Sequence, residues 1–126
     1  MILDSDVLIW FFRGNENAKK IVRVNIPFSI SAVSYMELLQ GALNKQELLG
    51  IKKFLEKAET KIIPMNEGIT HRAMEYVESY ALSDSMELAD ALIAATAIEN
   101  DETLCTANGK HYKCLPNLKM DLFKVE

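Results

Sequence analysis

The chain has 126 residues, of which 49% are hydrophobic and 25% charged, and its formal net charge is −4 at neutral pH. A chain of this length buries a core of its own, so we expect one domain over residues 1–126. Its two cysteines are too few for a disulfide framework, and its two histidines, His71 and His111, lack the paired spacing of a zinc site.

The first residues give no sign of export. Residues 1–6 contain no positively charged segment followed by an apolar stretch, so a secretory signal is not expected. No uninterrupted apolar run approaches the ~18 residues that a membrane span needs. We therefore expect a cytoplasmic protein without a membrane-spanning segment.

Short strand-like segments alternate with helix-like segments along the chain. The predicted strands cover residues 2–3, 28–32, 61–64, 103–106 and, as a fifth that the pattern leaves open, 118–125. After a dense apolar stretch at 7–12, helices are predicted from Asn15 or Asn17 to Arg23 and over 34–43, 45–58, 67–82 and 84–99. This alternation predicts an α/β fold, a three-layer α/β/α sandwich around a mostly parallel sheet of four to five strands.

Two carboxylates follow the first predicted strand directly. In parallel α/β folds the site forms beyond the carboxyl ends of the strands, and Asp4 occupies such a position. Asp4 and Asp6 together would form an oxygen-rich pocket suited to a hard cation. The alternative is that one of the two caps the helix that follows, and the pattern does not decide for either residue alone.

Asp90 lies inside the most apolar predicted helix, in the run 88–98 that holds almost no other polar residue. Because the helix start is predicted at Asp84 and Glu87, capping does not explain Asp90. A buried carboxylate without a partner is costly or becomes protonated. We therefore expect a metal ion beside Asp90, with a buried hydrogen-bond network as the alternative.

Three other polar positions have ordinary structural explanations when each is taken alone. Ser34 and Glu37 have the spacing of a capping box, in which Glu37 bonds back to the backbone of Ser34. Asn108, before Gly109 and just past the fourth predicted strand, is typical of a turn. His111 alone is better explained by a surface or packing role than by catalysis.

Taken together, four segments resemble the motifs of the PIN-domain nucleases, in particular the VapC-type toxins of prokaryotic toxin–antitoxin pairs. The matching segments, in the family's order, are residues 4–9, 34–41, 88–97 and 106–112. Glu37 and Asp90 stand at the acidic positions of the second and third. The fourth departs from the family because it has Asn108 where an aspartate often stands, which leaves the site without that charge.

The resemblance implies a domain that hydrolyses RNA phosphodiester bonds with a divalent metal, as the toxin of a type II toxin–antitoxin system. The catalytic residues would be Asp4, Glu37, Asp90 and Asn108. The ligands of Mg²⁺ or Mn²⁺ would be Asp4, Asp90, Glu37 and Asp6. The implied partners are an RNA substrate, a cognate antitoxin protein and a second copy of the chain in a homodimer.

The acidic balance counts against a nucleic-acid binder, since phosphate contacts need a basic surface. A metal bound among the carboxylates would cancel much of their charge, so that basic residues around the rim could guide the phosphate. Arg13, Lys110 and Lys113 are the candidates for substrate binding. Such residues are equally typical of solvated helix faces.

Trp10, Phe11 and Phe12 are three successive large apolar side chains, and one helix face does not bury all three easily. Core packing between helices is one explanation. The other is a groove for an antitoxin peptide, which the resemblance implies and which an exposed aromatic patch would fit.

Two other classes of protein stay open. Asp4 and Asp6 also match the opening motif of the HAD-type phosphohydrolases, in which Asp4 would be a nucleophile, but the chain has no Gly-Asp pair for that family's metal motif. The second is a catalytically degenerate PIN-like binding module, which Asn108 favours. Metal-dependent cleavage of RNA would separate a nuclease from a binding module.

Overall fold

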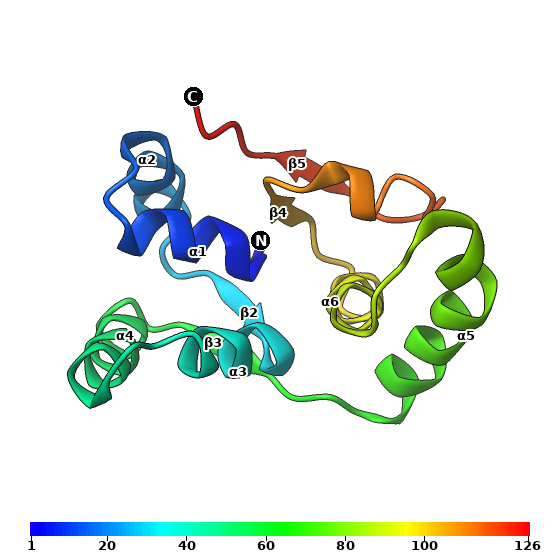
Figure 1. The fold of residues 1–126 in the computed structure, drawn as a ribbon, viewed down its shortest axis with the longest axis horizontal. Helices are drawn as coiled ribbons and strands as arrows, with labels where there is room; N and C mark the ends of the chain where they lie inside the picture. Colours follow the sequence, from blue (N-terminus) through cyan, green and yellow to red (C-terminus); the bar gives the residue numbers. More distant parts are fainter.

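The computed structural model describes all 126 residues, and at its centre lies one parallel sheet (Figure 1). Its strands are β1 (Ile2–Leu3), β2 (Ser29–Ser31), β3 (Lys61–Ile63), β4 (Leu104–Thr106) and β5 (Met120–Leu122). The order across the sheet is β3-β2-β1-β4-β5, and every neighbouring pair is parallel. The predicted parallel sheet is confirmed, and the fifth strand that the pattern left open is present.

Helices cover both faces of this sheet. They are α1 (Ser5–Phe12), α2 (Glu16–Val24), α3 (Ala32–Gln40), α4 (Lys45–Lys57), α5 (Glu67–Asp84) and α6 (Leu88–Glu99), with a short 3₁₀ helix, η1 (Gly109–His111), after β4. One core joins the sheet to α5 and α6, and the other joins it to α1, α2 and α4, which lie on the other side of the strands in Figure 1. The three-layer α/β/α prediction is confirmed. None of the helices is long and apolar enough to cross a bilayer.

Strand β1 contains only apolar residues because helices cover it on both faces. Successive side chains of a strand point to opposite faces, so Ile2 enters the core under α5 and α6 while Leu3 enters the core under α1 and α2. Both side chains are fully buried. The residue that follows, Asp4, is therefore carried to the centre of the sheet's carboxyl edge.

The chain also reverses its direction across the sheet at β1. Strands β2 and β3 lie to one side of it, and β4 and β5 lie to the other. Open parallel sheets place their sites outside the carboxyl ends of the strands at such a switch point. Asp4 follows β1 and Thr106 ends β4, and the backbone N–H of Asp4 donates to the carbonyl of Cys105 at 2.9 Å.

Asparagine side chains fix where three of the helices begin. Asn15, Asn44 and Asn66 each accept a hydrogen bond from the backbone N–H three residues further along. This contact satisfies one of the N–H groups that a helix start leaves without a partner. The prediction left Asn15 and Asn17 open as the start of the second helix, and Asn15 is the capping residue.

The predicted start of α3 is wrong. Ser31 is its N-cap and accepts the backbone N–H of Ser34 at 2.9 Å, so the helix begins at Ala32 and ends at Gln40 rather than at residue 43. Ser34 and Glu37 therefore do not form a capping box. The carboxylate of Glu37 is free to make other contacts.

The predicted start of α6 is wrong as well. Asp84 is the last residue of α5, and Ser85 ends that helix in the left-handed conformation with φ 55°. Helix α6 begins at Leu88, and Glu87 before it makes no side-chain cap hydrogen bond. Asp90 therefore lies in the first turn of α6, not beyond it as the prediction assumed.

Candidate active site

Asp4 lies at the centre of the candidate site and is only 5% exposed. It is the N-cap residue of α1, and its Oδ1 accepts the backbone N–H of Ser5 at 2.8 Å. The capping alternative therefore holds for Asp4, and its role as a metal ligand stays a prediction. Oδ1 of Asp4 bonds to the start of α1, and Oδ2 faces residues from elsewhere in the chain.

Two hydroxyl groups donate to that second oxygen. Thr106 Oγ1 and the hydroxyl oxygen of Tyr112 each lie 2.9 Å from Oδ2 of Asp4. The backbone N–H of Asn108 donates to Thr106 Oγ1 at 3.0 Å, which directs the hydroxyl hydrogen of Thr106 towards the carboxylates. Burial raises the pKa of Asp4, and the hydrogen bonds from Tyr112, Thr106 and Ser5 act in the opposite direction.

Burial also keeps the Tyr112 hydroxyl a donor. It raises the pKa of Tyr112, and the nearby charges of Asp4 and Asp90 raise it further. A tyrosine in this setting retains its proton at neutral pH and donates it to a carboxylate.

Asp6, in the first turn of α1, lies beside the hydroxyl of Thr106. Its Oδ2 accepts the backbone N–H of Ala107 at 3.0 Å and lies 3.3 Å from Thr106 Oγ1. Burial, followed by the charge of Asp4, raises the pKa of Asp6 to about 7. Its other oxygen, Oδ1, is buried and has no hydrogen-bond partner.

Glu37 reaches the site from α3. Its Oε1 accepts a hydrogen bond from Ser5 Oγ at 3.1 Å, so Ser5 joins α3 to the start of α1. Burial raises the pKa of Glu37, and the charges of Asp4 and Asp90 add to the effect. Glu37 is therefore an acid that faces other acids and not a capping residue.

Asp90 completes the cluster from the first turn of α6, where its side chain is 15% exposed. Its Oδ1 lies 3.4 Å from the hydroxyl of Tyr112. Its Oδ2 lies 3.1 Å from Nδ1 of His111 but makes no hydrogen bond of acceptable geometry. A hydrogen-bond network and an oxygen without a donor are thus both present at Asp90.

The four carboxylates gather without a lysine or arginine partner. Among the ion pairs of the structure, only the contact between Asp90 and His111 involves any of them. Carboxylates that share a site repel one another and hold their protons more tightly. A bound cation would remove this repulsion.

The residues present fit a hard divalent cation. Asp6 Oδ1 and Asp90 Oδ2 are buried without a donor, a costly state unless a positive group faces them. The side chains as they stand do not form a ready set of three ligands. Mg²⁺ does not require one, because it is commonly held by one or two carboxylates and keeps several of its waters.

The remaining predicted site residues, Asn108, Lys110, Lys113 and Arg13, stay predictions. Asn108 has an exposed side chain, and only its backbone N–H contacts the network. Lys110 and Lys113 are exposed, within and just after η1. Arg13 follows the end of α1, where its guanidinium lies 5.7 Å from the centre of the Trp10 ring.

Ser5, Thr106 and Tyr112 contact the carboxylates and were not predicted. Thr106 gave a signal that could have been used, since it is a polar residue at the end of a buried strand. Tyr112 gave none, because its acceptor Asp4 is 108 positions away in the sequence. Only the fold brings the two together.

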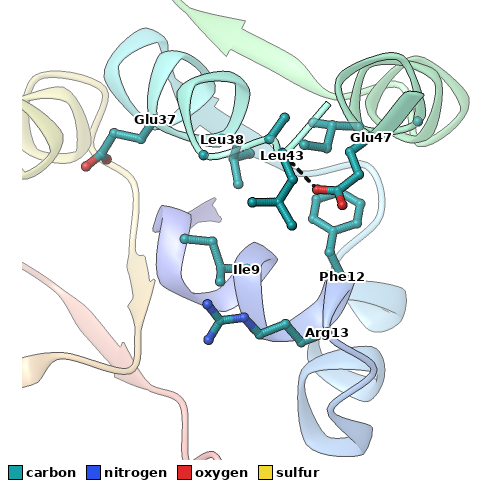
Figure 2. Close-up of a pocket in the computed structure, with 11 residues that line it drawn as sticks. Ile9, Phe12, Arg13, Glu37, Leu38, Leu43 and Glu47 are labelled. Carbon is teal, nitrogen blue, oxygen red and sulfur yellow. Dashed lines mark hydrogen bonds between the residues drawn. The ribbon is translucent and has the colours of Figure 1, made fainter. Parts of the chain in front are cut away.

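A groove beside the site runs between α1, α3 and α4 (Figure 2). Its apolar lining consists of Ile9, Phe12, Leu38, Ala42, Leu43 and Ile51. Glu37 lies at one end, so the groove leads to the carboxylate cluster. Glu47, also in the lining, accepts the backbone N–H of Leu43 at 3.1 Å.

The three successive aromatic residues are divided between the core and this groove. Trp10 and Phe11 are half-buried, and the ring of Phe11 packs on Phe54 with 4.7 Å between centroids. Phe12 packs edge-on against the same ring but remains 39% exposed and lines the groove. Core packing therefore accounts for Trp10 and Phe11, and the use of the groove by an antitoxin peptide stays a prediction.

A five-stranded parallel sheet with acidic side chains at its central carboxyl edge defines an α/β protein whose candidate site is a cluster of carboxylates. The family model of the PIN domain matches residues 1–114. The chain therefore belongs to the PIN domain family, and the predicted family and fold are confirmed. It is 35% identical over 123 residues to Ribonuclease VapC10 of Mycobacterium tuberculosis, a match that covers 94% of this chain and 90% of that protein.

Solved structures agree with this assignment. A toxin–antitoxin complex from Klebsiella pneumoniae contains a chain that is 26% identical, with a TM-score of 0.78 and 93% of both chains covered. The structure of VapBC2 from Rickettsia felis, bound to a DNA fragment from its promoter, gives a TM-score of 0.82 over 98% of both chains. At 22% identity, the second likeness shows the fold alone.

Proposed function

We propose that the chain is a divalent-metal-dependent endoribonuclease, the toxin of a type II toxin–antitoxin pair. The observation that carries the proposal is the meeting of Asp4, Asp6, Glu37 and Asp90, with two buried carboxylate oxygens that lack donors. Membership of the PIN domain family and the likeness to Ribonuclease VapC10 support the reaction. The phosphohydrolase alternative is withdrawn, because the chain belongs to a different family.

Asp4, Asp6, Glu37 and Asp90 would hold Mg²⁺ or Mn²⁺, which supplies a water of lowered pKa and offsets charge on the reacting phosphate. The donors around Asp4 fix the orientation of that carboxylate and oppose the rise that burial causes in its pKa. In this proposal, the Asn108 amide positions the water or the substrate at the rim. Lys110 and Lys113, which follow Asn108 in the chain, would attract the RNA backbone by charge. Arg13, which lines the same groove as Glu37, would do so as well.

The groove between α1, α3 and α4 is the proposed docking surface for the antitoxin. Six of its eleven lining residues are apolar, and it ends at an acid of the site. An apolar segment that carries a basic residue at one end would bury its apolar face there and pair its charge with Glu37. The toxin–antitoxin complex among the structural relatives supports a protein partner, whereas a homodimer rests on the family resemblance.

The test is cleavage of a mixed RNA by the purified protein with Mg²⁺ or Mn²⁺, compared with the same reaction in EDTA and with the Asp90→Asn variant. We expect cleavage that requires metal and is lost in Asp90→Asn, while circular dichroism shows an unchanged fold. Cleavage by the variant at the wild-type rate would overturn the assignment.

The second candidate is a degenerate binding module, which the absence of a charge at Asn108 favours. Calorimetric titration of Mn²⁺ into the protein separates it from the nuclease. A nuclease site with four carboxylates should bind the ion, and a degenerate site should not. The Asp90→Asn variant is the control for binding elsewhere on the acidic surface.

A further inference from the structure

Tyr112 has an unusual position for so large a polar side chain. It follows η1, is fully buried, and belongs to the core that joins the sheet to α5 and α6. Its hydroxyl leaves this core at the carboxyl edge of the sheet, 2.9 Å from Asp4 Oδ2 and 3.4 Å from Asp90 Oδ1. The ring is therefore held by packing, while the hydroxyl meets two acids from different elements.

The hydroxyl has one hydrogen to donate. The shorter contact favours Asp4 as its acceptor, and Asp90 lies at the limit of hydrogen-bond distance. The rigid aromatic ring thus holds one hydroxyl between these two carboxylates. Neither carboxylate has a lysine or arginine partner.

The donors around Asp4 determine which of its oxygens can accept a further partner. A carboxylate offers about two lone-pair directions on each oxygen. The hydroxyls of Tyr112 and Thr106 occupy both directions on Oδ2. Oδ1 accepts the backbone N–H of Ser5, and the Ser5 hydroxyl is closer to Glu37 (3.1 Å) than to Oδ1 (3.4 Å). Oδ1 is therefore the oxygen of Asp4 with a direction left for a cation.

We infer that Tyr112 is a positioning residue of the metal site. With Thr106 it saturates Oδ2 of Asp4, turns Oδ1 towards the ion, and fixes the distance between Asp4 and Asp90. This role rests on the proposed function, since it concerns the divalent ion proposed there. It requires no contact between Tyr112 and the ion or the RNA.

The Tyr112→Phe variant tests this role because it removes the hydroxyl and keeps the ring that fills the core. The matched control is Tyr80→Phe, which removes a hydroxyl from a half-buried tyrosine on α5. Mn²⁺ affinity is measured by calorimetric titration for the wild type and both variants. Thermal unfolding is recorded in EDTA, and RNA cleavage is followed against metal concentration.

We expect Tyr112→Phe to weaken Mn²⁺ binding about tenfold or more, the usual effect of removing a residue that orients a metal ligand. The metal concentration for half-maximal cleavage should rise by a similar factor, while Tyr80→Phe behaves as the wild type. Folding in EDTA should be retained, because the packing of the ring is unchanged.

Two results would overturn the inference, and they are distinguishable. If the wild type binds Mn²⁺ and Tyr112→Phe binds it equally well, Tyr112 has only a structural role and the proposed function stands. If the wild type binds no divalent metal, the proposed function and the inference fail together. Should Tyr112→Phe be unfolded in EDTA, the Thr106→Val variant removes the other Oδ2 donor and is held to the same criterion.

Discussion

Nδ1 of His111 lies 3.1 Å from Oδ2 of Asp90. His111 is the one basic side chain that forms an ion pair with the carboxylate cluster. His111 is 43% exposed on its side-chain surface, whereas the Asp90 side chain is 15% exposed. The imidazole thus covers, from the solvent side, a carboxylate oxygen that lacks a hydrogen-bond donor. The imidazole of His111 therefore occupies a position to which a cation bound by Asp90 would also be attracted.

Replacing His111 by alanine should therefore strengthen metal binding. We expect Mn²⁺ affinity to rise a few-fold because the imidazole no longer competes for Asp90 Oδ2, and stability to change by no more than about 0.5 kcal/mol, as for most exposed positions. Calorimetric titration and denaturant unfolding measure the two effects. A loss of affinity of tenfold or more would instead make His111 a ligand of the ion.

The acids of the site should make the metal-free protein less stable as the pH rises. The pKa of Asp6 is raised from 3.8 to about 7, and those of Asp4 and Glu37 are raised as well. A carboxyl group whose pKa is higher in the folded state binds more protons there than in the unfolded state. Its contribution to the free energy of unfolding is therefore lost as the pH rises from about 4 to about 7.

Thermal unfolding in EDTA at a series of pH values between 4 and 8 measures this dependence, with Asp6→Asn as the comparison. The variant should show a smaller loss of stability over the same interval, because it lacks the group that titrates near 7. Addition of Mg²⁺ should restore stability at pH 7.5 and have little effect at pH 5. An unchanged pH dependence in Asp6→Asn would show that other groups are responsible.

Glu37 is the residue for which the sequence pattern and the fold disagree most directly. If Ser34 and Glu37 formed a capping box, Glu37→Gln would retain the cap and alter little. In the structure Glu37 faces Ser5 and other acids, so the same change removes a charge from the cluster. We expect metal affinity and cleavage to fall about tenfold or more, with no loss of stability.

Circular dichroism, unfolding and calorimetric titration of Glu37→Gln check this prediction. Glu47→Gln is the matched control, because the Glu47 carboxylate also accepts a hydrogen bond, from the backbone N–H of Leu43, but lies away from the acids. If both variants bind Mn²⁺ as the wild type does, Glu37 is not part of the metal site.

The sequence predicted the strands of the sheet better than it predicted the helix starts. β1 is short and wholly apolar, so its end at Asp4 could be located from composition alone. The start of α3 could not, because Ser31 and Ser34 are both acceptable N-caps and only tertiary packing selects Ser31. The same holds for α6, where a left-handed residue at Ser85 separates two segments of helical pattern.

Asp90 joins the carboxylate cluster, although part of the argument that selected it is wrong. The sequence pattern excludes capping at Asp90, yet Asp90 lies in the first turn of α6. What distinguishes it is burial beside Tyr112 without a full set of donors. Contacts of this kind join residues far apart in the sequence, which is also why Tyr112 and Thr106 were not predicted.

The groove between α1, α3 and α4 gives the last prediction, the loss of antitoxin binding when its apolar lining is charged. Leu43 is 85% exposed, so Leu43→Glu should cost little stability while placing a negative charge in the groove. Leu82 on α5 is fully exposed and lies outside the groove, which makes Leu82→Glu the matched control. Each variant is co-expressed with the proposed antitoxin partner and assayed by affinity co-purification.

We expect Leu43→Glu to lose the antitoxin and Leu82→Glu to retain it. The reason is that an apolar peptide face gains little from burial against a surface that must also desolvate a new carboxylate. Metal binding should be the same in both variants, since neither residue contacts the acids. Retention of the antitoxin by Leu43→Glu at wild-type level would place the docking surface elsewhere on the molecule.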